Sequence, residues 1–490
     1  MGKEGRKDQK QGWVMSKKER IAYYLGCAGF GGNNGAVGMF LTTYLILSGV
    51  DVVVSALILL LVKIIDAVDD ILLGWLADRI TFKKRWPGPG KYLPWLRIGA
   101  FILPISTILL FRIPQSFSTV GKLIWYAVAY MVWDIAYTMC DMPNGAITTT
   151  MTTNNDERMN ILSKRYVAMI GLIYPILAVA TILMSENVGV SISNTMFIVT
   201  IIFFIFSLIE VLTVRERVVE EMLESDDGEN ELKGEGYSIK QMFAYLKSNK
   251  MMLLLYGSKI AIGALGSKVG VFVGFYLFGS SLYSLIFMFG ALIPSLIIMA
   301  LLAKILKKVS KVKLVSFACV MYVIIMVTIF FFGSGAKVAI IHYVLYVLSL
   351  IFLQIPVLVV PMMIPDLAEY GRYKTGINAT GITFSMGTFV EKLNSAISSS
   401  LGLILIGLFG WVAVQAADFS ELAALGVTQP ASALSALWFV HTLLPAIGAA
   451  IMFILLRFYK IKEKDVPIMI LANNGEITRE DAEKQMGTNK

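Results

Sequence analysis

Three aspartates lie inside an apolar stretch of the chain, residues 52–77. Asp66 and Asp70 are one helical turn apart and Asp69 is three residues after Asp66, so a helix directs all three carboxylates to much the same side. Each charge at the centre of a membrane helix costs about 2.5–3.5 kcal/mol. Two neighbouring carboxylates in a low dielectric share a proton or hold a small cation. The spacing predicts a site for Na⁺, Li⁺ or H⁺, completed by Asp69 and by the hydroxyl of Thr138.

A simpler interpretation of the same residues stays open. Lys63 lies one turn before Asp66 and can pair with it, while Asp69 and Asp70 extend toward the lipid headgroups. We favour the cation site because three acids outnumber one base.

A second polar group lies between Tyr137 and Pro143. Asp141 shares a helix face with Thr138, three residues before it. Pro143 frees backbone carbonyls beside it. A carboxylate here suits a bidentate hydrogen bond to the vicinal hydroxyls of a sugar. The alternative is an ion pair between Asp141 and Lys392, and both roles are compatible because a site residue can be paired when the site is empty.

The composition places these residues in a membrane protein. The chain has 490 residues, of which 57% are hydrophobic and 16% are charged, whereas a soluble protein carries about 25% charged residues. Apolar runs of about 20 residues recur from end to end. They predict an all-α membrane protein with twelve transmembrane helices, near residues 21–49, 52–77, 94–113, 121–150, 163–185, 190–213, 251–279, 281–304, 312–333, 338–364, 378–410 and 431–458.

The basic residues predict the orientation in the membrane. Lys and Arg gather in alternate loops and in both terminal segments, which are therefore expected in the cytoplasm. The net charge of +9 comes from these loops, so it does not indicate nucleic acid as a partner. We expect a multi-pass protein of the cell (inner or plasma) membrane, with membrane lipid around it.

A long polar segment divides the chain into two halves of six predicted helices. Glycines recur in the first helix of each half, which suits close helix packing and a tandem repeat. The predicted organisation is an N-terminal tail, a six-helix bundle, a cytoplasmic linker, a second six-helix bundle and a cytoplasmic tail, at residues 1–20, 21–214, 215–250, 251–458 and 459–490.

Several function classes are disfavoured. The nucleotide-binding pattern G-x-x-x-x-G-K-[ST] is absent, and two histidines and three cysteines show no metal-binding spacing. We expect no enzyme, no cofactor and no metal other than the coupling cation. Any uphill work must then draw on an ion gradient.

The loop after the second predicted helix carries the most specific pattern. Its form is D-x-x-x-D-x-x-x-G-x-x-x-D-R from Asp66 to Arg79, followed by G-K-x-x-P-W from Gly90 to Trp95. This resembles the glycoside-pentoside-hexuronide cation symporter family, the family of the bacterial melibiose carrier, within the major facilitator superfamily. Three further stretches agree with it: 137–143, 156–166, and 365–371 followed by Lys392.

The resemblance implies a major facilitator fold of two six-helix bundles and a role for individual residues. It implies a cation site at Asp66, Asp69, Asp70 and Thr138, and contacts to a sugar, direct or organising, by Asp141, Tyr137, Arg165 and Lys392. The chain also departs from the family pattern. Asn33 and Asn34 stand where the family has a sugar-binding Asp, Gly145 replaces a stacking aromatic residue, and Ile71 replaces a proline.

The expected function is therefore cation-coupled symport of a glycoside by alternating access, with Na⁺ or H⁺ as the coupling ion and Asn33 and Asn34 able to bind substrate hydroxyls. The alternative is a facilitator or exporter of a lipid-like or other non-sugar solute on the same fold. A cytoplasmic latch is also expected, in which Asp78, Arg79 and Asp366 act as gating residues.

Overall fold

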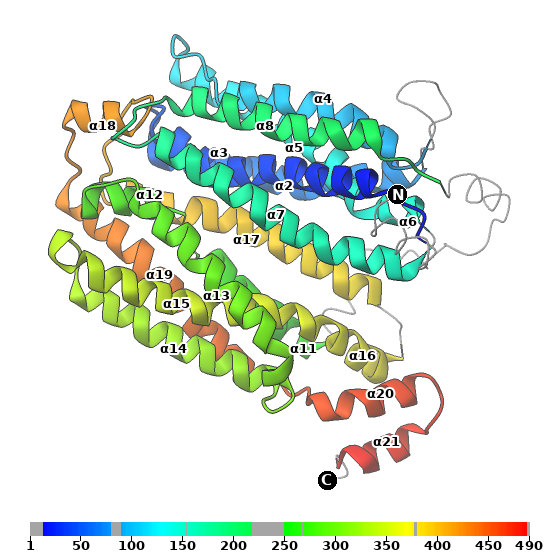
Figure 1. Ribbon diagram of the computed structural model, residues 1–490. Coiled ribbons are helices and arrows are strands. Elements are labelled where there is room, and N and C mark those ends of the chain that lie inside the picture. The colour runs from blue at the N-terminus through cyan, green and yellow to red at the C-terminus, as the bar shows by residue number, and fades with distance from the viewer. Residues whose placement is uncertain are drawn as a thin grey trace. The chain divides into compact units, whose positions relative to one another are not determined.

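The computed structural model describes residues 13–79, 90–152, 154–217, 249–266, 268–376 and 380–487. Within these ranges the chain is helical, a helix lies at each of the twelve predicted positions, and only an isolated β-bridge joins Ser48 to Gln415 (Figure 1). Eight of the described helical segments are long and apolar enough to cross a membrane: 93–110, 119–146, 156–183, 192–213, 311–332, 339–375, 381–408 and 431–457.

The described residues fall into two compact units. Unit 1 contains the first half of the chain together with Ala413–Thr428, and unit 2 contains the rest. The elements of unit 1 are α2 (Lys17–Ile46), α3 (Val52–Arg79), α4 (Leu93–Leu110), α5 (Thr119–Ala146), α6 (Thr148–Met151), α7 (Asn155–Leu183), α8 (Ile192–Thr213) and α18 (Phe419–Leu425). Helix α2 packs against α7 and α8, α3 against α5, and α4 against α5 and α8.

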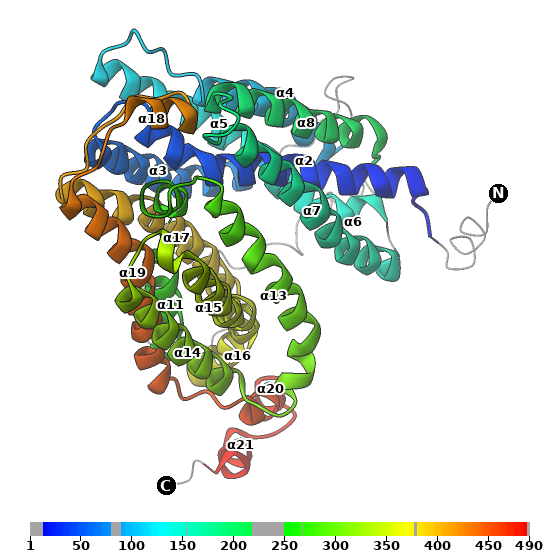
Figure 2. The same cartoon turned by 60° about the vertical axis from the view of Figure 1, so that its left-hand side comes forward.

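Unit 2 is built from more irregular elements. They are α11 (Lys250–Ala264), α12 (Gly270–Phe272), the π-helix η2 (Val273–Leu277), α13 (Tyr283–Leu306), α14 (Lys311–Phe332), η3 (Ala336–Val338), α15 (Ala339–Val359), η4 (Val360–Met363), α16 (Ile364–Thr375), α17 (Thr380–Leu408), α19 (Ala431–Arg457), η5 (Glu463–Asp465), α20 (Val466–Asn473) and α21 (Arg479–Met486). Helix α14 packs against α15 and α19, and α11 against α17 and α19 (Figure 2).

The predicted seventh span is interrupted. A single helix over 251–279 is expected, but α11 ends at Ala264 and helical structure resumes only at Gly270. Gly263, Gly266 and Gly270 lie at this break. Glycine has the largest backbone entropy to lose in a helix, so a cluster of glycines favours the interruption.

The start of α2 is fixed by local hydrogen bonds. Ser16 accepts from the Glu19 backbone nitrogen at 3.2 Å, and the Glu19 carboxylate accepts from the Ser16 backbone nitrogen at 3.1 Å. This reciprocal pair satisfies two backbone donors that a helix start leaves open. The Arg217 guanidinium also binds both Glu19 oxygens, at 2.6 and 2.7 Å. The first residues of the predicted linker are therefore held on unit 1.

Three glycines let α8 approach α2 closely. A Cβ at Gly26 would lie 1.5 Å from Glu210 Oε2, and Cβ atoms at Gly29 and Gly32 would overlap Ser207 and Phe203. The expectation of close packing along the first span is confirmed on this face of α2.

Gly26→Ala is expected to lower the free energy of unfolding by about 1–3 kcal/mol, because the added methyl group forces α2 away from α8. The matched control is Gly38→Ala on the same helix, where a Cβ meets nothing within 4 Å. That change is expected to be neutral or mildly stabilising. Equal unfolding curves of the two variants in a denaturing-detergent titration would contradict the close contact at Gly26.

The motif from Gly90 to Trp95 has a structural role at the start of α4. The backbone nitrogens of Lys91, Tyr92 and Leu93 donate to the Glu216 carboxylate at 3.0–3.1 Å. Gly90 has φ +147°, and a Cβ there would lie 2.1 Å from Glu216 Oε2. An acid that accepts from the first amides of a helix is stabilising because the helix dipole is positive at that end. The motif thus needs a glycine and an acid 126 positions later.

A loop from the second half of the chain completes unit 1. Ala416 donates its backbone N–H to Leu47 O at 3.0 Å, and the Ala417 carbonyl accepts from Ile192 N at 2.8 Å. Phe419 N also bonds to Met184 O at 3.1 Å. Residues 413–428 therefore pack on the loops after α2 and α7, although their neighbours along the chain, α17 and α19, belong to unit 2.

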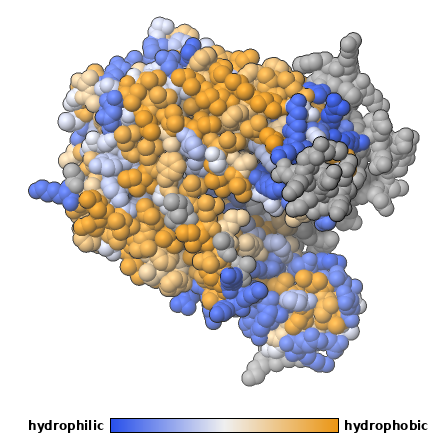
Figure 3. All heavy atoms as spheres, in the orientation of Figure 1, coloured by the Kyte–Doolittle hydropathy of each residue, from blue (hydrophilic) through white to orange (hydrophobic). Residues whose placement is uncertain are grey.

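Apolar side chains gather on one face of unit 1, over α4 and α8 (Figure 3). Ile198, Ile201, Ile205, Ile209 and Leu212 of α8 are all exposed. Their spacing of three or four residues makes an outward apolar stripe. A soluble protein rarely exposes so continuous an apolar surface, and acyl chains are the natural environment for this one.

The C-terminal residues form helices on α16. Tyr373, Met469, Ala482 and Met486 make a small buried cluster. Asn473 Nδ2 donates to the backbone oxygen and to Oε2 of Glu369, at 3.0 and 2.8 Å. A mainly polar tail is expected at 459–490, but its few apolar residues recur at helical spacing and anchor α20 and α21.

Candidate functional site

Helix α3 carries all three aspartates of the predicted cation site. Asp66 is partly exposed, and Lys63 and Asp66 both take part in interactions. The side chains of Asp69 and Asp70 lie outside the described part of the structure. Thr138 is on α5, where it is 8% exposed, and α5 is a packing neighbour of α3. Helices α3 and α5 are therefore adjacent. The cation site itself stays a prediction, with the ligands Asp66, Asp69, Asp70 and Thr138.

A line of hydrogen bonds joins α2 to the acid of α5. Asn34 Nδ2 donates to the Tyr137 hydroxyl at 3.0 Å, and that hydroxyl donates to Asp141 Oδ1 at 3.0 Å. Tyr137 and Asp141 are one turn apart on α5, so the helix itself aligns them. The line places an amide, a phenol and a carboxylate side by side, and Asp141 at its end is exposed.

An aromatic pair supports this line from α5. The rings of Trp133 and Tyr137 are stacked, with centroids 5.6 Å apart and planes 3° apart. Trp133 Nε1 donates to Asn33 Oδ1 at 3.0 Å, and the Thr107 hydroxyl lies 3.1 Å from the same oxygen. Asn33 is 4% exposed. Of the two asparagines predicted to meet substrate, the structure therefore buries Asn33 behind the stack and leaves Asn34 in the line.

Arg165 belongs to a different group of polar side chains, on α7. Its Nη1 donates to the Tyr23 hydroxyl at 3.2 Å, which donates in turn to the Asn144 carbonyl at 3.3 Å. Asn144 Nδ2 binds both oxygens of Glu210, at 3.1 and 3.2 Å. Cys27 Sγ lies 3.1 Å from Asn144 Oδ1. The predicted sugar contact Arg165 thus lies in a buried network that ties α2, α5, α7 and α8 together.

Sequence reasoning missed three acids. Asp134 on α5 is buried and lies one turn before Thr138, on the same face as Asp141. Glu210 on α8 and Glu157 on α7 are both 0% exposed. An acid within or beside an apolar run was the signal that identified Asp66, and the same signal applies to Asp134 and Glu210.

Glu157 is fully buried and accepts several hydrogen bonds. It accepts from Val14 N and Met15 N, both at 3.0 Å, and from the Thr152 hydroxyl at 2.6 Å. Arg20 Nη1 lies 3.8 Å from Oε1. One buried carboxylate therefore fixes the segment before α2 to the start of α7.

In unit 2, Lys392 lies on α17, is partly exposed and takes part in interactions. Its neighbour Glu391 forms an ion pair with Lys259 of α11, at 2.7 Å. Asn394 Nδ2 donates to the Lys259 carbonyl at 3.1 Å. These bonds fix α17 against α11 and hence set the position of Lys392.

The predicted gating residues lie in both units. Asp366, in the first turn of α16, pairs with Lys311 of α14 at 2.6 Å. Asp78 and Arg79 end α3, and their side chains lie outside the described residues. The gating role of all three stays a prediction.

The chain is similar to known proteins over nearly all of its membrane portion. A family model described as MFS/sugar transport protein matches residues 22–463. The chain is 26% identical over 459 residues to the uncharacterized symporter YjmB of Bacillus subtilis (strain 168), covering 92% of this chain and 94% of that protein. It is 23% identical over 431 residues to the glucuronide carrier protein homolog of Escherichia coli (strain K12), covering 82% and 86%.

A solved structure shares the fold. The nucleoside transporter NupG matches with a TM-score of 0.58 and 13% identity, covering 91% of this chain and 99% of that one. At this identity the likeness concerns the fold alone, which is that of the major facilitator superfamily.

Proposed function

Because the chain belongs to the family of MFS/sugar transport proteins, we propose that it moves a sugar or glycoside across the cell membrane together with Na⁺ or H⁺. It is a multi-pass membrane transporter rather than an enzyme. The names of its relatives, among them a glucuronide carrier homolog, support a hydroxyl-rich substrate.

The line from Asn34 through Tyr137 to Asp141 carries the proposal. A sugar presents hydroxyl groups that both donate and accept, and this line offers an amide, a phenol and a carboxylate in sequence. The Trp133–Tyr137 stack holds the phenol in place. Substrate hydroxyls compete for Asp141 and Asn34. Contacts of the sugar with Arg165 and Lys392 stay predictions that follow from the family resemblance.

Cation coupling is assigned to the acids of α3. Na⁺ or H⁺ neutralises Asp66, Asp69 and Asp70, with Thr138 as an oxygen ligand. Asp141 lies three residues after Thr138 on α5, so an occupied cation site changes the field at the sugar. Each ligand then raises the affinity of the other by the same factor.

Alternating access is assigned to movement of the two six-helix halves about the site, as in other transporters with repeated halves. The termini and the segment between the halves lie in the cytoplasm. Asp78, Arg79 and Asp366 act as gating residues on that side. The ion pair between Asp366 and Lys311 breaks and re-forms during the cycle. Exchanging the charges of Asp78 and Arg79 without any change in transport kinetics would remove the latch from the proposal.

Counterflow in proteoliposomes tests the substrate class. Vesicles loaded with one of a panel of glycosides are expected to take up the matching radiolabelled sugar, and the uptake is expected to depend on Na⁺ or on a pH gradient. Uptake of no glycoside in the panel under either condition would exclude the sugar proposal.

Tyr137→Phe is expected to raise the half-saturating sugar concentration about tenfold, because it removes a hydrogen bond to a charged group while the ring still stacks on Trp133. The measurement is counterflow at a series of sugar concentrations. The matched control is Tyr126→Phe on the same helix, whose buried hydroxyl has no hydrogen-bond partner among the described residues. Equal sugar affinities in the two variants would count against the line of hydrogen bonds.

One observation favours a second candidate. A Cβ at Gly145 meets nothing within 4 Å, so open space replaces the family's stacking aromatic residue. A larger or lipid-like solute, moved by facilitation or export, suits that space. The same vesicles separate the two candidates, since a facilitator equilibrates its solute whether or not an ion gradient is present.

A further inference from the structure

Helix α8 carries an acid, Glu210, one turn before the helix ends at Thr213. The residue lies in an apolar segment that is long enough to cross a membrane, and it is 0% exposed. Gly26 of α2 leaves the room for its carboxyl group, because a Cβ at Gly26 would overlap Glu210 Oε2. An ionisable side chain in such a position is costly and is therefore expected to have a function.

The carboxyl group of Glu210 has one hydrogen-bond donor among the described residues. Asn144 Nδ2 lies 3.2 Å from Oε1 and 3.1 Å from Oε2. None of the ion pairs between described residues includes Glu210. An ionised carboxylate has about four acceptor positions, and a buried charge without a partner is neutralised instead. A neutral, protonated carboxyl group fits these surroundings.

Two other acids of unit 1 have the surroundings that an ionised carboxylate needs. Glu157 is equally buried, but it accepts from two backbone nitrogens and a threonine hydroxyl, and Arg20 lies 3.8 Å away. Glu216 accepts from three backbone nitrogens at the start of α4. Hydrogen bonds and cations of this kind favour the charged form of an acid. The single amide beside Glu210 does not supply them.

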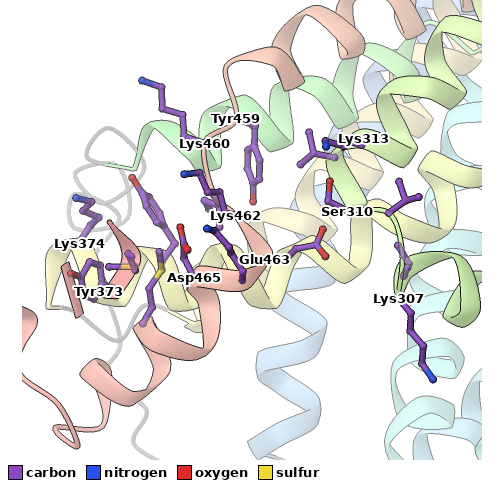
Figure 4. A pocket seen from close by; sticks show the side chains of 18 of the residues that line it. Lys307, Ser310, Lys313, Tyr373, Lys374, Tyr459, Lys460, Lys462, Glu463 and Asp465 are labelled. Atoms are coloured by element: carbon purple, nitrogen blue, oxygen red, sulfur yellow. The ribbon is translucent and has the colours of Figure 1, made fainter. Parts of the chain in front are cut away.

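Acids at the helix ends of unit 2 are also placed for a negative charge (Figure 4). Glu463 and Asp465 line a surface pocket together with lysines of α14, α16 and the segment after α19. Glu463 also accepts a hydrogen bond from the Lys311 backbone nitrogen. Positive neighbours favour the carboxylate form, so Glu210 differs from these acids in its surroundings as well as in its depth.

The charged and titratable groups around the pair of Glu210 and Asn144 do not neutralise Glu210. They are Tyr23 and Cys27 of α2, Arg97 of α4, Cys140 of α5 and Arg165 of α7. The phenol and the thiols are uncharged at neutral pH. Arg97 donates to the Val211 carbonyl at 3.2 Å. Arg165 donates to the Tyr23 hydroxyl at 3.2 Å. Both arginines are therefore bonded to other groups in this arrangement.

We propose that Glu210 is a proton-binding site, which holds a proton in this arrangement and releases it when Arg165 moves from Tyr23 to Glu210. The O–H bond of the carboxyl group then breaks, the proton passes to water, and the guanidinium neutralises the carboxylate that is left. Arg165 has donors to spare for this exchange, because its Nε is buried without a hydrogen-bond partner among the described residues. An arginine beside an acid favours its charged form.

The site lies where several helices of unit 1 end or begin. Glu210 and Asn144 are close to the ends of α8 and α5, and Tyr23 and Arg165 lie about two and three turns after the starts of α2 and α7. The proposed topology places these helix ends toward the cytoplasm, so the proton exchanges with water on that side. The site is separate from the acids of α3. Its part in the transport cycle rests on the proposed function, whereas proton binding by Glu210 does not.

Infrared spectroscopy of the full chain in lipid tests the site without any substrate, because a protonated carboxyl group and a carboxylate absorb at different frequencies. The original protein is expected to show a protonated carboxyl band at neutral pH that disappears in alkaline buffer. Glu210→Gln keeps the size and neutrality of the side chain and is expected to lose this band. The matched control, Glu216→Gln, removes a carboxylate and should keep the band. A band of equal size in all three proteins would overturn the proposal.

Arg165→Gln tests the exchange of partners and leaves Glu210 itself in place. Without the guanidinium that favours the carboxylate, the band is expected to disappear about one pH unit higher, which is a tenfold rise in the affinity for the proton. The control is Lys164→Gln, an exposed neighbour on the same helix. The same titration midpoint in both variants would overturn the exchange between Tyr23 and Glu210.

Counterflow tests whether the proton site takes part in transport. Exchange of a transported glycoside by the original protein is expected to fall about tenfold for each pH unit above the infrared midpoint, because the protonated fraction falls by that factor. Glu210→Gln should lack this fall, and Glu216→Gln should retain it. Equal pH profiles of the two variants would overturn the role of Glu210 in transport. A panel without any transported sugar would instead contradict the proposed function and leave the infrared result as it stands.

Discussion

Asp66→Asn is expected to abolish gradient-driven accumulation of the sugar while leaving equilibrating exchange measurable. An amide carries no charge to be neutralised, so the substrate site no longer depends on an ion that moves with it. One charge crossing about 100 mV supplies about 2.3 kcal/mol, which corresponds to about fiftyfold accumulation. In the Asp66→Asn variant the ratio of the sugar concentration inside the vesicles to that outside is expected to be about one, because nothing then links the sugar to the gradient. Uptake into vesicles with an imposed membrane potential measures this ratio.

The control for Asp66 is Asp51→Asn, the same chemical change just before the same helix. Asp51 is exposed, and its Oδ1 accepts from Val53 N and Val54 N, a role that asparagine also fills. Accumulation by this variant should match that of the original protein. Full accumulation by both Asp66→Asn and Asp70→Asn would make the assignment of coupling to α3 wrong.

Glu157→Ala is expected to lower the free energy of unfolding by about 3–5 kcal/mol, the range seen when one member of a buried charged group is removed. Val14 N, Met15 N and the Thr152 hydroxyl lose their acceptor at once, and Arg20 loses a nearby counter-charge. Unfolding in mixed micelles of denaturing detergent, followed by circular dichroism, measures the change.

The neighbouring residue supplies the control for Glu157. Asp156 is exposed in the first turn of α7. Asp156→Ala is therefore expected to change the free energy of unfolding by no more than about 0.5 kcal/mol. Glu157→Gln keeps an acceptor oxygen but no charge. Its loss of unfolding free energy should lie between those of Asp156→Ala and Glu157→Ala. A loss of similar size in Asp156→Ala and Glu157→Ala would show that the buried contacts of Glu157 add little.

Adjacent residues show where sequence reasoning reached its limit. The stretch 156–166 agrees with the family pattern but does not say which of its two adjacent acids matters, and the structure exposes Asp156 and buries Glu157 beside it. Asn33 and Asn34 are equivalent in the sequence, yet one lies behind Trp133 and the other bonds to Tyr137. Successive residues differ by about 100° around a helix, so a small uncertainty in helix rotation exchanges their roles.

The sequence alone was sufficient for the all-helical membrane architecture and the helix positions, and it identified Asp66 and Asp141 as candidate site residues, a role that stays a prediction. These depend on the length of apolar runs and on charges within them, which are properties of the chain in one dimension. Only the tertiary structure determined that Glu216 caps α4, that residues 413–428 join unit 1 and that Lys311 pairs with Asp366. Such contacts join residues far apart in the chain, and hydrophobic periodicity fixes which face of a helix is apolar, not which neighbour that face meets.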